Sequence, residues 1–146
     1  MADGTFERQS IALASPQPLW ALWELSRDQS NTKLSMEFIA LANHRKSIKV
    51  EIAHYAERSR QLQVDAVSSA LARYGVAGDE CQPVALTFFL AGISRFLLVE
   101  EAFGMSLGHA EAITIVERFL RQLEGDRLLD VNGQVLGSHH GPSSSV

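Results

Sequence analysis

The most constraining feature of the sequence is a long apolar stretch that begins at Pro83 and runs to Phe103. Proline is favoured at the first position of a helix, and the spacing of the apolar residues predicts one continuous helix. These residues follow three lines: Leu86, Leu90, Ile93 and Leu97; Phe89, Phe96, Val99 and Phe103; and Val84, Phe88 and Leu98. A helix that is apolar on all sides must be buried on all sides. One side can face the core of this chain, and we expect another to face a partner; the pattern leaves open which line does so.

A second apolar helix follows a tight turn that contains Gly104 and Gly108, with Ser106 as its expected N-cap and Gly125 at its end. Its wide apolar stripe consists of Ala112, Ile113, Val116, Phe119, Leu120 and Leu123. Two such helices form an antiparallel hairpin, and two hairpins from two chains make a four-helix bundle. We therefore expect a homodimer whose interface includes Gly92, Phe96, Val99, Ile113, Val116 and Leu120. The alternative is that both helices lie inside one monomeric bundle.

The rest of the chain is also helical in pattern. Ser15 and Pro16 offer an N-cap and first position for a short helix that runs to Arg27. Leu34, Phe38 and Leu41 share one helical face, and a long helix from Ser47 closes at Gly75. Since no useful alternating pattern occurs, the predicted class is all-α, an orthogonal or antiparallel bundle of about five helices.

Three segments divide the chain. Residues 1–14 are weakly patterned and are expected to be an N-terminal tail, a remnant linker or the end of a preceding helix. Residues 15–125 form the helical domain. Residues 126–146 are small and polar, which predicts a disordered tail.

Composition narrows the class of function. The net charge of −4 argues against a nucleic-acid surface, which normally carries a basic patch. One cysteine, Cys81, excludes an internal disulfide and suits a reducing compartment. The N-terminus shows no secretory signal, and Arg95 lies inside the longest apolar stretch, so we expect no membrane span and a cytoplasmic protein.

No motif for catalysis stands out. Glu51 and His54 form one Glu-x-x-His pair, whereas a di-iron bundle needs two such pairs and two further glutamates. We interpret the pair as solvated or salt-bridged. Phosphate loops, nucleophile elbows and zinc-protease motifs are absent from the sequence, and Cys81 has no base nearby in sequence. The sequence predicts no enzyme, no metal and no cofactor.

The remaining charged groups have structural interpretations. Arg95 needs a carboxylate partner if it is buried, and a glutamate of another helix is a better candidate than Glu100 or Glu101. Glu111, next to His109 in the first turn of the last helix, suits the helix dipole. The basic cluster of residues 44–46 with Lys49 is interpreted as a solvated face.

The aromatic residues are more informative. Several of them, on four different predicted helices, occupy probable core faces: Trp20, Trp23, Phe38, Tyr55, Phe88 and Phe89. Aromatic side chains that converge between helices, with a few polar tips, are typical of a pocket for a small apolar molecule. The other interpretation is that these residues belong simply to the core.

Three segments carry a family resemblance: Pro18–Ser26, Glu37–Lys46, and Glu100–Gly104 with Gly108–Glu111. With the order of the helices, they resemble the C-terminal effector-binding and dimerisation domain of TetR/AcrR-family transcriptional regulators, particularly actinobacterial ones. The resemblance covers about residues 15–125. It implies that the domain binds a small, often apolar effector and that its last two helices build the four-helix bundle of a dimer.

The chain departs from the family at its N-terminus. Family members carry a helix-turn-helix DNA-binding domain ahead of this one, and the residues before Ser15 contain no such motif. The resemblance implies a bacterial regulator whose effector controls DNA binding by the parent protein, while this chain alone is not expected to bind DNA. The alternative is a structural or protein-interaction dimer with no small-molecule ligand; a metal-dependent bundle enzyme is a more remote third.

Overall fold

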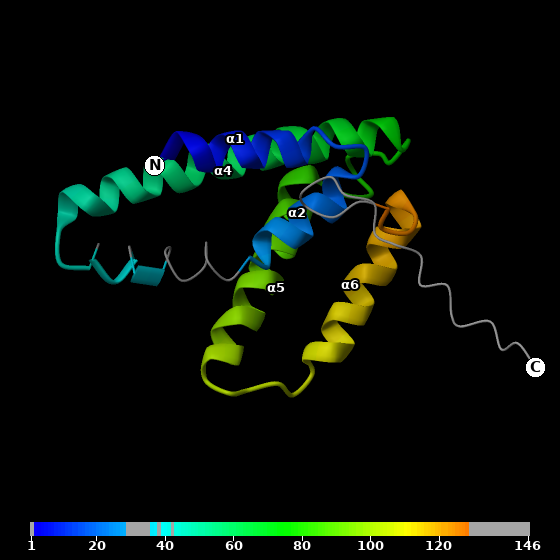
Figure 1. The fold of residues 1–146 in the computed structure, drawn as a ribbon. Coiled ribbons are helices and arrows are strands. Elements are labelled where there is room, and N and C mark those ends of the chain that lie inside the picture. Colours follow the sequence, from blue (N-terminus) through cyan, green and yellow to red (C-terminus); the bar gives the residue numbers. More distant parts are fainter. Residues whose placement is uncertain (1, 29–35, 38, 42, 129–146) are drawn as a thin grey trace, which may run out of the picture.

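The structure, a computed structural model, describes residues 2–28, 36, 37, 39–41 and 43–128. It confirms the all-α class, with helices α1 (Ala2–Leu13), α2 (Pro18–Ser26), α4 (Lys46–Arg73), α5 (Pro83–Ala102) and α6 (His109–Glu124). In Figure 1, α1 lies along the long helix α4, while α5 and α6 extend away from this layer to a shared turn. Helix α2 lies between the layer and the α5–α6 hairpin, in contact with α1, α4, α5 and α6.

The first residues form a helix rather than a tail or linker. Helix α1 packs against α2 and α4, and it buries Gln9, Ala12 and Leu13, three residues at helical spacing. The Ser59 hydroxyl of α4 donates a hydrogen bond of 3.0 Å to the Gln9 side-chain oxygen. This short face contains only two apolar side chains, which explains why the sequence pattern was weak.

Helix α2 begins two residues later than Ser15 and Pro16 predicted. Pro18 occupies the first turn, and Gln17 is the N-cap residue but makes no side-chain capping bond. Because the residue before a proline is disfavoured in the helical region, Pro18 prevents the helix from starting earlier. The Ser15 hydroxyl is buried and has no hydrogen-bond partner, so it caps nothing.

The helix ends follow the glycines that the sequence indicated. After α4, Gly75 has φ +73°, and the Val76 N–H donates to the Leu71 carbonyl at 3.0 Å. Gly104 repeats this arrangement after α5, and Gly125 follows α6 with φ +75°. The start of α6 differs from the prediction: Gly108, at φ +85°, is the N-cap residue, so the helix begins at His109 and the Ser106 side chain makes no cap.

The core gathers around the aromatic helix α2. Its buried residues Leu19, Trp20, Leu22 and Trp23 pack in one cluster with Val67 and Leu71 of α4, Leu86, Leu90 and Leu97 of α5, and Val116 and Leu120 of α6. The line of α5 that includes Leu86, Leu90 and Leu97 therefore faces the core of its own chain. The helix expected through Leu34 and Phe38 lies largely outside the described residues.

Helix α5 is also long and apolar enough to cross a membrane, the one such helix in the described part of the chain. Arg95 therefore does not exclude a membrane span on the grounds of length and composition, contrary to the expectation from the sequence. A single helix of this kind is weak evidence for a membrane span, because core helices of soluble proteins have the same composition.

Candidate functional site

An apolar groove lies between α5 and α6, at the hairpin that Figure 1 shows extending from the rest of the molecule. It has a volume of about 550 Å³ and is open along one side. Its lining comes from α5, from the turn and from the first turns of α6: Phe88, Phe89, Gly92, Ile93, Phe96, Leu97, Glu100, Leu107, Gly108, His109 and Ala112. The groove exists because the line of α5 that contains Leu86, Leu90 and Leu97 faces the core around α2 and α4. The two lines of α5 that contain the phenylalanines are left uncovered.

Large apolar side chains stand in solvent around this groove. Phe89 is 60% exposed, Phe96 is 64% exposed and Leu107 is 99% exposed. We call eight exposed apolar residues of the hairpin the apolar face: Phe88, Phe89, Phe96 and Leu107, which line the groove, and Phe103, Met105, Ile115 and Phe119, which do not. Contiguous exposed apolar patches of several hundred Å² mark interaction surfaces on soluble proteins.

The predicted interface residues divide between this face and the core. Gly92 and Phe96 are exposed, and Val99 and Ile113 are half-buried. Val116 and Leu120 are instead buried inside the same chain, against α2 and its neighbours. These two residues therefore belong to the core and not to an exposed face. On α6 the exposed apolar side chains are Ile115 and Phe119. Phe119 belongs to the wide apolar stripe predicted from the sequence, whereas Ile115 does not.

A polar group closes one end of the groove. His109, only 8% exposed, has its Nε2 atom 3.2 Å from Glu100 Oε1 and its Nδ1 atom 3.9 Å from Glu101 Oε1. The two carboxylates come from the last turn of α5 and the imidazole from the first turn of α6. This contact joins α5 to α6 beside the turn. The sequence placed these residues near one another but did not predict that they would be in contact.

Of the six aromatic residues predicted to form a pocket, the five that the structure describes lie in separate places. Trp20 and Trp23 are buried in the core, and the Trp20 Nε1–H donates to the Gly125 carbonyl at 3.0 Å. Tyr55 packs on Phe6 of α1, with ring centroids 4.8 Å apart. Phe38 lies outside the described residues, so its place in a pocket stays a prediction.

The other two pocket candidates, Phe88 and Phe89, line the groove, with ring centroids 6.3 Å apart. The Arg60 guanidinium of α4 lies 5.4 Å from the centroid of the Phe88 ring. Such a cation–π contact restrains the Phe88 side chain on the side nearest α4. These two residues therefore contribute to the open surface rather than to the core between α2 and α4.

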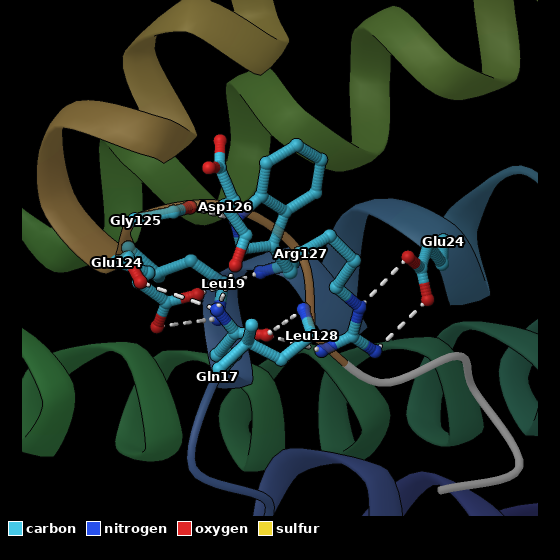
Figure 2. A network of polar contacts seen from close by, with 9 residues as sticks. Gln17, Leu19, Glu24, Glu124, Gly125, Asp126, Arg127 and Leu128 are labelled. Carbon is cyan, nitrogen blue, oxygen red and sulfur yellow. Dashed lines mark hydrogen bonds and ion pairs between the residues drawn. The ribbon is translucent and has the colours of Figure 1, made fainter. Parts of the chain in front are cut away.

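A second polar cluster, which the sequence did not predict, ties α6 to α2 (Figure 2). The Glu124 carboxylate accepts the N–H of Trp20 at 2.9 Å and the N–H of Leu19 at 3.2 Å. The Tyr74 hydroxyl donates to the same carboxylate. The first N–H groups of a helix have no partner within it, so Glu124 supplies the cap that Gln17 does not.

The Gln17 side chain also links the start of α2 to residues at and after the end of α6. Its Nε2 donates to the backbone carbonyls of Glu124 and Asp126, at 3.2 and 2.7 Å, and its Oε1 accepts from Leu128 N–H. Arg127, nearly buried, makes a two-pronged ion pair with Glu24 at 2.9 and 3.0 Å (Figure 2). We call Gln17, Glu24, Glu124 and Arg127 the junction. Residues 126–128 of the expected tail are thus ordered against α2, and residues 129–146 lie outside the described part.

The other sequence candidates bring no chemistry together. Glu51, His54 and Arg95 are exposed, so Arg95 does not need the buried ion pair expected for it. Within the described residues, no group of three metal-binding side chains occurs. Arg45, Lys46 and Lys49 are exposed at the start of α4.

Comparisons of the chain with protein-family models, with curated proteins and with solved structures found no match.

Proposed function

We propose that this chain is the dimerisation and effector-binding domain of a TetR-like transcriptional regulator, acting in the cytoplasm. The observation that carries the proposal is the apolar face on α5 and α6, on the hairpin that pairs two subunits in the family the sequence resembles. The same hairpin is tied to α2 by the junction at one end, and at its turn His109 joins α6 to α5. A hairpin with an uncovered apolar surface suits a permanent protein interface.

The size of the apolar face supports a dimer. With aromatic side chains at 150–250 Å² each, the exposed fractions of its five phenylalanines correspond to about 600 Å² per chain, and Met105, Leu107 and Ile115 add to this area. A stable, specific interface buries about 800 Å² on each partner. A second copy of the chain presents the same surface, and a two-fold pairing of identical faces is the commonest way to close such an assembly.

The effector half of the proposal rests on the resemblance. One observation favours the second candidate, a helical dimer without a small-molecule ligand: Trp20 and Trp23 are buried within the packed core cluster of α2, α4, α5 and α6. If the chain is the sensor domain, DNA binding belongs to the parent protein, and we expect no operator binding by this chain alone.

Native mass spectrometry of the purified chain tests the two candidates. A dimer that retains a small organic molecule, released on activation in the gas phase, supports the sensor domain. A dimer with no retained molecule, and none taken up from an apolar compound library, supports the structural dimer instead. A monomer at micromolar concentration contradicts both.

A further inference from the structure

Gly92 has no role inside its own chain that explains a glycine. It lies in the interior of α5, where glycine is less favourable than alanine because it leaves the backbone freer in the unfolded state. Its backbone is exposed, and a Cβ atom added there would meet no atom within 4 Å. A positive φ or a close neighbour within the chain is therefore not the reason. A glycine in such a place allows another backbone or a large side chain to approach closely.

The residues around Gly92 are arranged symmetrically. Phe88 lies four residues before it and Phe96 four residues after it, and all three line the groove. Residues four apart lie on the same side of a helix, one turn from each other. Both phenylalanines are more than half exposed. If a two-fold axis perpendicular to α5 passes beside Gly92, each Phe88 meets the partner's Phe96, because such an axis pairs residue i with j and j with i.

The charges select the direction of the pairing. Glu100 and Glu101 lie at the C-terminal end of α5, and the His109 ring of α6 lies 3.2 and 3.9 Å from them. Parallel α5 helices would bring the glutamates of both copies to one level, where like charges repel. In an antiparallel crossing they lie at opposite ends, each beside the start of the partner's α5. That start, Pro83–Leu86, contains no acidic residue, and the nearest acidic residues, Asp79 and Glu80, lie in the loop before α5.

From these observations we infer that two copies of this chain pair with their α5 helices antiparallel and crossing at Gly92. Each copy places Phe96 next to the partner's Phe88, in the space that the absent side chain of Gly92 leaves open. The groove is thus half of a site that the second copy completes. This inference rests on the proposed dimer, and it adds the point of contact and the relative direction of the two chains.

Replacing Gly92 with leucine tests the crossing. The substituted side chain points into open space within its own chain, so the helix content measured by circular dichroism stays unchanged. In the dimer it occupies the crossing point, and we expect the dissociation constant from sedimentation equilibrium to rise about 10- to 100-fold. Gly92→Ala gives a smaller rise. Gly78→Leu, at another glycine with no atom near its Cβ position, is the matched control and leaves the constant unchanged.

Cross-linking tests the direction independently. In a Cys81→Ser background, Phe88→Cys and Phe96→Cys chains are prepared separately, mixed and treated with a short bismaleimide. We expect the mixed pair to cross-link more efficiently than either variant with itself. Preferential linkage of Phe96→Cys with itself would contradict the antiparallel crossing. An unchanged dissociation constant for Gly92→Leu would contradict the contact at Gly92, while the dimer itself stands; a monomeric wild-type chain would overturn both proposals.

Discussion

At the scale of single residues, the Glu124 side chain joins parts of the junction that are far apart in the sequence. One carboxylate accepts two N–H groups of α2 and the hydroxyl of Tyr74 from α4. It therefore joins three helices that are distant in sequence. A local sequence pattern cannot reveal such a cap, because Glu124 lies more than one hundred residues from the helix end that it completes.

Replacing Glu124 with glutamine should lower the free energy of unfolding by about 2 kcal/mol, since a helix cap and a charged hydrogen bond are weakened together. Urea denaturation at a fixed protein concentration measures this change. The control is Glu117→Gln, whose carboxylate makes an i,i+4 pair with Arg121 and should matter by less than about 0.5 kcal/mol. Equal effects of the two variants would contradict the role of Glu124.

Tyr74 gives the junction a pH dependence. Burial and the hydrogen bond to Glu124 raise the pKa of Tyr74 from 10.0 to about 12. The folded chain then holds this proton more tightly than the unfolded chain does, so stability is fully present below pH 10 and falls as the pH rises toward 12. After allowance for solvent screening, the loss is about 1 kcal/mol. Tyr74→Phe should remove this alkaline loss in urea titrations at pH 9 and pH 11.5, and a loss that persists unchanged in that variant would contradict the assignment.

At the scale of helices, the ends were predictable where glycine determines them. The helices end at Gly75, Gly104 and Gly125, as the sequence indicated, and each of these glycines adopts positive φ. The starts were less predictable. Pro18 set the first turn of α2 in place of Ser15, and Gly108 set that of α6 in place of Ser106. A serine before an apolar run resembles a cap in sequence, but the backbone that the next proline or glycine imposes decides where the helix begins.

The turn between α5 and α6 depends on Gly104. An alanine at φ +75° is strained, so Gly104→Ala should destabilise the chain by about 1–2 kcal/mol. Gly78→Ala, at a glycine without positive φ, serves as the control and should be neutral or slightly stabilising. Thermal unfolding followed by circular dichroism measures both. If the two variants melted together, the left-handed turn at Gly104 would not be needed.

At the scale of the whole molecule, the sequence predicted that α5 is too apolar for a single chain to cover, and the structure leaves two of its lines exposed. It did not predict which half of the α6 stripe faces inward. Val116 and Leu120 share that stripe with Phe119, and only the packing against α2 separates them. The aromatic pocket was harder to predict. Helical spacing shows which residues share a face of one helix, but it does not show whether the faces of four helices meet.

The most direct test of the account is the assembly state of a Phe96→Asp variant, measured by sedimentation equilibrium beside the wild type. Phe96 is 64% exposed and supports no core contact, so the variant should fold with unchanged helix content. Ile11→Asp, on α1 and 67% exposed, is the matched control. The account predicts a dimer for the wild type and for Ile11→Asp, and a monomer for Phe96→Asp at micromolar concentration. A wild-type monomer, or a Phe96→Asp dimer as tight as the control, would contradict it.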